Sequence, residues 1–103
     1  MNEFNNTWTF PQNIGFDMVP SYSMKFEKIS HNETILFDLS KTESTHSSFI
    51  GFLIYAKQKM EISGGNLVFK ISSPFEKLLN MLHLIEFLTL RHHIKNTDKI
   101  KTH

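Results

Sequence analysis

Cysteine is absent from this chain of 103 residues. Without thiols the chain forms no disulfide and has no cysteine nucleophile, a composition that fits a reducing compartment. Neither sign of charge dominates, because 11 basic residues are balanced by 10 acidic ones. This balance does not mark the chain as a binder of nucleic acid or of a membrane surface.

Long hydrophobic runs are also missing. None approaches the ~20 apolar residues that cross a bilayer. The opening MNEFNNTWTF lacks the basic start and the apolar stretch of a signal peptide. We therefore expect a soluble, cytoplasmic protein that has no nucleic-acid partner and does not itself insert into a membrane.

Aromatic and aliphatic residues are abundant. Hydrophobic types make up 40% of the sequence, and the chain has ten phenylalanines. This composition is typical of one small globular domain with an aromatic core, and the length leaves no room for a second. We therefore assign residues 1–103 to a single domain. Its polar ends, 1–6 and 92–103, are expected to be flexible tails.

Hydrophobic periodicity predicts strands that alternate with helices. The nearly continuous apolar run at 34–39 is typical of a central strand covered on both faces. Alternation of this kind implies right-handed βαβ crossovers and a largely parallel sheet. We expect an α/β fold with a small mixed, mainly parallel sheet of about four strands and helices mainly on one face. The predicted strands are 7–10, 34–39, 66–71 and 86–90, and the predicted helices are 20–30, 48–62 and 74–83.

Particular residues define the helix boundaries. Pro20 suits the first turn of the first helix. Gly64 and Gly65 are expected to end the second helix by supplying positive φ. Ser73 is the predicted N-cap of the third helix, with Glu76 as its capping-box partner. The second helix is expected to bury Phe49, Phe52, Leu53, Ala56 and Met60 and to turn Lys57, Gln58, Lys59 and Glu61 to solvent, and His83 is expected to end the third.

Two adjacent serines, Ser47 and Ser48, stand where the polar loop 40–46 meets the second helix. Free backbone N–H groups and the helix dipole favour an anion at such a position. A serine here is either a plain helix cap or a phosphate acceptor whose added charge the helix end would stabilise. The two interpretations lead to different functions.

The order and spacing of several short motifs resemble the STAS domain of bacterial anti-sigma-factor antagonists. The resemblance covers 34–90 and extends more loosely over 7–33. That family shows a strand ending in Asp-Leu, a loop ending in Asp-Ser-Ser/Ala-Gly, a helix, a Gly-Gly turn, an apolar strand and a helix leading into a Gly-Leu pair. The corresponding positions here are Asp38-Leu39, His46-Ser47-Ser48, Gly51 inside the helix, Gly64-Gly65, Ser73-Pro74 and His83-Leu84.

The resemblance implies a partner-binding role without catalysis. In phosphorylated members a GHKL-type kinase modifies the serine after the Asp, which corresponds to Ser47, with Ser48 as the alternative. Such a domain captures an anti-sigma factor, and ATP belongs to the partner, so no cofactor or metal is expected. Phosphate would repel a carboxylate-bearing partner. The expected partner-binding residues are Asp38, His46, Ser47, Ser48, Phe49 and Ile50.

Three departures from the family pattern open an alternative. His46 replaces the family Asp, Phe49 replaces a glycine, and the N-terminal part offers one strand where the family often has two. The missing strand suggests a sheet edge that a partner or a second copy would cover. The two replacements favour a STAS-like structural subunit that binds the ATPase of an ABC-type lipid-transport complex without phosphorylation.

Catalytic and metal-binding interpretations are weaker. His46 beside a serine lacks a third orienting group and a G-x-S-x-G pattern. Asp38 at a strand end is more often an organiser of the next loop than a metal ligand or a general base. His92, His93 and His103 have no Cys or carboxylate that completes a metal site. The basic tail from Arg91 contains four cations and no interleaved aromatics, as is typical of a solvated tail.

Overall fold

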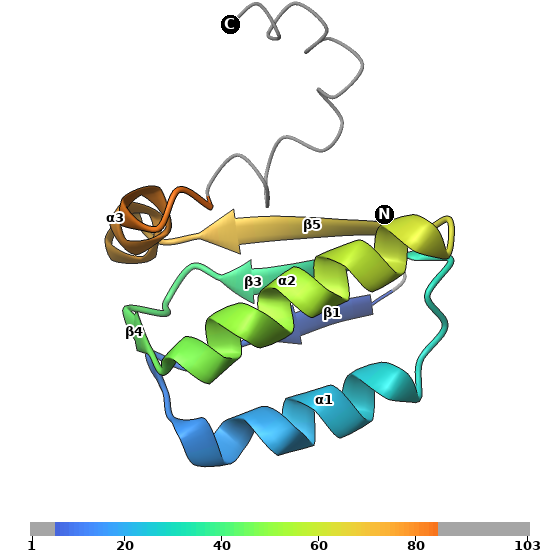
Figure 1. Ribbon diagram of the computed structural model, residues 1–103, viewed down its shortest axis with the longest axis horizontal. Coiled ribbons are helices and arrows are strands. Elements are labelled where there is room, and N and C mark those ends of the chain that lie inside the picture. Colours follow the sequence, from blue (N-terminus) through green and yellow to red (C-terminus); the bar gives the residue numbers. More distant parts are fainter. Residues whose placement is uncertain (1–5, 85–103) are drawn as a thin grey trace, which may run out of the picture.

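The computed structural model of this chain describes residues 6–84 (Figure 1). Six of the nine elements follow the alternating strand–helix order that the sequence predicts. The predicted last strand at 86–90 lies outside the described residues, as do the tails 1–5 and 92–103, whereas Asn6 begins the first strand. The elements are β1 (Asn6–Thr9), β2 (Asn13–Ile14), the 3-10 helix η1 (Phe16–Met18), α1 (Val19–Glu27), β3 (Thr34–Leu39), β4 (Ser44–Thr45), α2 (Ser47–Ile62), β5 (Asn66–Ile71) and α3 (Ser73–Met81).

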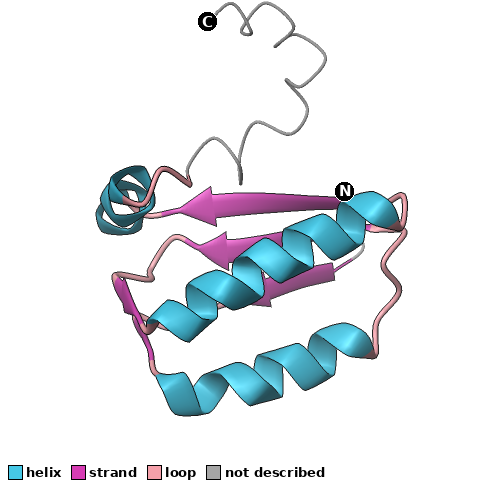
Figure 2. Ribbon diagram, viewed as in Figure 1, coloured by secondary structure: helices cyan, strands magenta, loops and turns pink. Residues whose placement is uncertain are grey.

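The main sheet has three parallel strands in the order β1-β3-β5. Each crossover leads to the adjacent strand in the same direction, which places successive helices on one face of a sheet. Both helices reach the same aromatic cluster, because Trp8 of β1 contacts Phe26 of α1 and Phe52 of α2. The predicted α/β class and the parallel pairing are therefore confirmed over the described residues (Figure 2).

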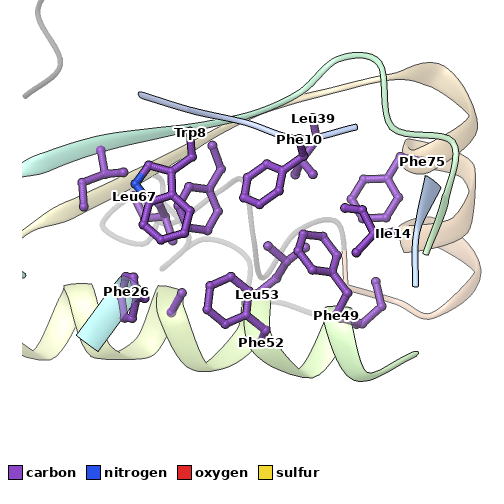
Figure 3. Close-up of a cluster of buried hydrophobic side chains, with 14 of the residues drawn as sticks. Trp8, Phe10, Ile14, Phe26, Leu39, Phe49, Phe52, Leu53, Leu67 and Phe75 are labelled. Carbon is purple, nitrogen blue, oxygen red and sulfur yellow. The ribbon is translucent and has the colours of Figure 1, made fainter. Parts of the chain in front are cut away.

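The core lies between the sheet and these two helices (Figure 3). Side chains alternate along β3, so that Ile35, Phe37 and Leu39 are buried while Leu36 and Asp38 are half-buried on the opposite face. The expectation that both faces of this strand are covered is thus not met by the described residues. The apolar run reflects the central position of β3 instead. The largest fully buried side chains include Phe10, Phe26, Phe37, Phe49 and Phe75.

Helix α2 ends at two glycines that have different roles. Gly64 has φ 87°, the left-handed conformation that the sequence predicts for it. Gly65 has no such φ, so this part of the prediction is wrong. Position 65 requires glycine because the chain there passes close to the turn after α1, where a Cβ would collide with the carbonyl oxygens of His31 and Glu33.

Lys57 of α2 is buried, contrary to its predicted position in solvent, with 2% of its surface exposed. Its Nζ donates a hydrogen bond to the Leu67 carbonyl at 3.2 Å and lies 3.8 Å from the Glu61 carboxylate. The ammonium also stands 5.6 Å from the centre of the Phe69 ring. A long aliphatic stem allows lysine to lie along apolar surface in this way while its charge finds polar partners.

Helix α3 begins one residue earlier than the sequence predicts. Ser72, not Ser73, is its N-cap, because the Ser72 hydroxyl accepts a hydrogen bond from the Phe75 amide at 3.2 Å. Glu76 therefore does not occupy the capping-box position. His83 follows the helix with φ 59°, which confirms that the helix ends there without a glycine. No helix within residues 6–84 is long and apolar enough to cross a membrane.

Candidate functional site

The predicted site lies at the carboxyl end of the sheet. Beyond β1 and β3 the chain forms a second parallel pair, β2 with β4, in which Ile14 stands opposite Thr45. This pair brings the starts of η1 and α2 side by side at one end of the molecule (Figure 1). The loop 40–46, expected to be irregular, therefore contains a short strand.

Thr42 holds the middle of this loop. Its side chain is fully buried, and its hydroxyl donates to the Pro11 carbonyl at 2.8 Å. Its amide donates to the Leu39 carbonyl at 3.1 Å, and its carbonyl accepts from the Ser72 hydroxyl. Since buried polar groups that are fully paired rigidify their surroundings, the loop is fixed between the end of β1 and the start of α3.

Further bonds join the loop to the segment before η1. The Gln12 carbonyl accepts from the Glu43 amide at 2.8 Å, and the Gln12 side chain donates to the Glu43 carboxylate at 3.0 Å. The Ser44 hydroxyl donates to the Asn13 side-chain oxygen at 2.7 Å. The sequence does not predict these hydrogen bonds between the two segments, because strands of two residues are too short to show an alternating hydrophobic pattern.

His46 is the N-cap of α2, a role that the sequence analysis considered only for the serines. Its Nδ1 accepts a hydrogen bond from the Ser48 amide at 3.1 Å and lies 2.9 Å from the Ser48 hydroxyl. Acceptance from a backbone N–H assigns the ring proton of the neutral imidazole to Nε2. The interpretation of Ser47 and Ser48 as caps is therefore wrong, because they are the first two residues within the helix.

The two serines differ in their surroundings. Ser47 is exposed, whereas Ser48 is half-buried beside the imidazole of His46. Both lie in the first turn of a helix of 16 residues, where the backbone partial charge is positive. Of the two, Ser47 presents its hydroxyl to solvent at this end of the molecule.

Phe49 and Ile50 do not belong to the surface, which corrects their place in the predicted partner-binding set. Phe49 is fully buried, with its ring centre 5.3 Å from that of Phe10 and 5.9 Å from that of Tyr22. Ile50 retains only 7% exposure. They follow the helical period of the buried stripe that includes Phe52 and Leu53. A bulky residue at position 49 therefore fills the core.

Asp38 organises the loop that follows β3, as its strand-end position predicts. Its Oδ1 accepts from the Ser40 hydroxyl at 2.6 Å and from the Ser40 amide at 3.0 Å. These two hydrogen bonds, with smaller contributions from the charges of Lys70 and Lys41, lower the pKa of the Asp38 carboxyl. Within residues 6–84 no three His, Cys, Asp or Glu side chains gather in a way that could hold a metal ion.

The lowered pKa of Asp38 predicts an acid-dependent loss of stability. Its contribution is complete above the unfolded-state pKa of about 3.9 and is lost as the pH falls through the lower folded-state pKa. We expect urea unfolding to show a smaller stability decrease on acidification for Asp38→Asn than for the natural chain. Ser40→Ala should also reduce the decrease, because it removes the hydroxyl donor. An unchanged acid dependence in both variants would contradict the assignment.

Phe16 is a surface residue of this end that sequence reasoning missed. It is 65% exposed, and its ring centre lies 5.4 Å from that of His46. The register of β2 with β4 creates this contact, because the paired residues Ile14 and Thr45 lie two positions before Phe16 and one position before His46. No local motif around Phe16 signals the contact, since it depends on the unpredicted strand pair.

A scan against protein-family models finds no match for the chain, and a search of curated proteins finds none either.

Proposed function

We propose that this chain is a non-enzymatic regulatory domain of the STAS type that binds a partner protein, in the manner of an anti-sigma-factor antagonist. The proposed partner is an anti-sigma factor with a GHKL-type serine kinase activity, which phosphorylates Ser47. The observation that carries the proposal is the exposed Ser47 at the first position of α2. It lies beside a loop that the rest of the fold holds in place.

The arrangement of this end supports a docking role. A protein partner needs a surface whose shape does not change on each encounter, and Thr42 with its three hydrogen bonds holds the backbone of loop 40–46. The described strands of the main sheet lie in the order in which they occur along the chain, β1-β3-β5. They therefore contain no reversal of strand order. A reversal of this kind is where open α/β sheets bind nucleotide ligands.

Phosphorylation would act here through charge. A phosphoserine carries close to two negative charges at neutral pH and three acceptor oxygens. Placed at the N-terminus of α2, it would be tolerated by the fold because the helix dipole is positive there. The same charge would alter any partner surface in contact with Ser47, so modification changes binding without unfolding the domain.

A phosphomimetic variant tests this switch. We expect Ser47→Asp to weaken binding of the anti-sigma partner by about tenfold or more, because unmatched charge in an interface is costly. Isothermal titration calorimetry with the purified partner gives the dissociation constants. Ser63→Asp is the matched control, since Ser63 is an exposed serine at the other end of α2. Equal affinity of Ser47→Asp and the natural chain would refute the switch.

The second candidate function is a structural subunit on the ATPase of an ABC-type lipid-transport complex, without phosphorylation. The observation that favours it is the cap itself, in which the imidazole of His46 stands where the family has a carboxylate. Affinity purification from the natural host separates the two functions. Recovery of a GHKL kinase supports the first, and recovery of a transporter ATPase with the membrane fraction supports the second.

A further inference from the structure

Two neighbouring serine hydroxyls at the start of α2 are candidate acceptors for a partner kinase. Ser47 and Ser48 differ by one position in the same helical turn, and their residue type is identical. Their surroundings differ, because only Ser48 lies within hydrogen-bond distance of the imidazole of His46. The following inference rests on the proposed function and concerns which hydroxyl that kinase uses.

One nitrogen of the imidazole contacts two groups of Ser48. Nδ1 accepts from the Ser48 amide at 3.1 Å, and the Ser48 hydroxyl stands 2.9 Å from the same nitrogen. The unprotonated Nδ1 has a single lone pair, so the Ser48 amide and the Ser48 hydroxyl share it as donors of a bifurcated hydrogen bond. The Ser48 oxygen is thereby held toward the ring.

Two contacts position His46, one through its backbone and one through its ring. The backbone amide of His46 donates to the Ile14 carbonyl at 2.9 Å, which ties the residue to β2. On the other side, the ring of Phe16 lies 5.4 Å from the imidazole, centre to centre. Rotation of the imidazole away from Ser48 would therefore lose the cap of α2 as well as the contact with Phe16.

We propose that His46 is a positioning residue that selects Ser47 as the modified serine by occupying the hydroxyl of Ser48. Phosphoryl transfer requires the acceptor oxygen to point at the γ-phosphorus and to give its proton to a base. Ser47 meets this requirement from its exposed position. Ser48 meets it only after breaking its hydrogen bond to His46 and turning outward from a half-buried site.

Phosphosite mapping in the natural host tests the selection. The full chain and three variants, His46→Ala, His46→Asn and Ser47→Ala, are expressed there, and fragmentation mass spectrometry measures occupancy at each serine. We expect phosphate on Ser47 in the natural chain. In His46→Ala the ratio of Ser47 to Ser48 occupancy should fall by about fivefold, the equivalent of one net hydrogen bond. His46→Asn, which keeps an acceptor for the Ser48 amide, should restore most of the preference.

The outcomes separate this inference from the proposed function. Phosphate on Ser48 of the natural chain, or a ratio that His46→Ala leaves unchanged, overturns the selection and leaves a phosphorylation switch in place. Phosphate on Ser48 that disappears in His46→Ala would show instead that His46 acts as a base for Ser48. Absence of phosphate from both serines in every variant overturns the proposed switch, and the selection with it. Strong phosphorylation of Ser48 in the Ser47→Ala variant also contradicts the selection, because His46 is intact there.

A measurement without a kinase checks the contact itself. Nitrogen chemical shifts of the His46 ring, measured by NMR on the full chain at neutral pH, distinguish the two neutral tautomers. We expect the proton on Nε2, and we expect the Ser48 amide resonance to move when His46 is replaced by alanine. A proton on Nδ1 would overturn the selection, because Nδ1 would then not accept from Ser48. Urea titration of each variant confirms that it is folded.

Discussion

Replacement of Phe37 by alanine is expected to lower the free energy of unfolding by about 3–5 kcal/mol. Phe37 is fully buried in the middle of β3, and its ring centre lies 5.0 Å from that of Trp8 and 5.1 Å from that of Phe10. It also contacts Phe52 of α2 and Phe69 of β5. The truncation would therefore remove ring contacts that link β3 to β1, β5 and α2, and a loss of this size is a large share of a small domain's stability.

The matched control for this change is Phe16→Ala. Phe16 is the same residue type but is 65% exposed, so its truncation should change stability by no more than about 0.5 kcal/mol. Urea denaturation, followed by the fluorescence of the chain's single tryptophan, measures both. Similar losses of unfolding free energy in the two variants would mean that the aromatic cluster around Phe37 does not stabilise the core.

Replacement of Gly65 by alanine is expected to cost about 3 kcal/mol, because the added methyl group meets backbone atoms that cannot move independently. The new Cβ would collide with the carbonyl oxygen of His31 and stand 2.7 Å from that of Glu33. The Met60 methyl group, 2.9 Å away, could turn aside. The strain therefore falls on the turn between α1 and β3, and thermal or urea unfolding would measure it.

Gly51→Ala is expected to have the opposite effect on stability. No atom lies within 4 Å of the Cβ position at Gly51, which is exposed in the interior of α2. Alanine there should stabilise the chain by up to about 1 kcal/mol through its higher helix propensity. Destabilisation by Gly51→Ala would contradict the open surroundings of Gly51, and tolerance of Gly65→Ala would contradict the close approach of Gly65 to the turn after α1.

The elements with strong local patterns were predictable. The strands 34–39 and 66–71 have the predicted bounds, because continuous apolar runs there are bordered by polar or glycine-containing turns. Helix α2 begins one residue before the prediction, at Ser47, and ends at Ile62 as predicted. The first helix ends at Glu27 instead of 30, which reflects the weak signals by which helix ends are recognised.

Features that depend on contacts between distant segments were not predictable. The pairing of β2 with β4, the burial of Lys57 and the need for Gly65 all arise from segments that meet only in the folded chain. The shift of the α3 cap from Ser73 to Ser72 has a different cause. Two adjacent serines have the same capping chemistry, and the contact of Ser72 with Thr42 is invisible in the local sequence.

The candidate site was predicted in position but not in detail. The sequence pattern places Ser47 correctly at an exposed helix start and Asp38 correctly at the turn after β3. It did not reveal that His46 would cap the helix, since histidine is not a common N-cap. It assigned Phe49 both to the buried stripe of the second helix and to the partner-binding surface, and only its burial is confirmed.

The most direct measurement of the central claim is the intact mass of the protein purified from its natural host, together with the identity of whatever co-purifies. The account predicts a population heavier by one phosphate group, removed by a serine phosphatase and absent from Ser47→Ala, and a GHKL-type kinase among the bound proteins. A single unmodified mass under every growth condition, with a transporter ATPase as the bound protein, would contradict it.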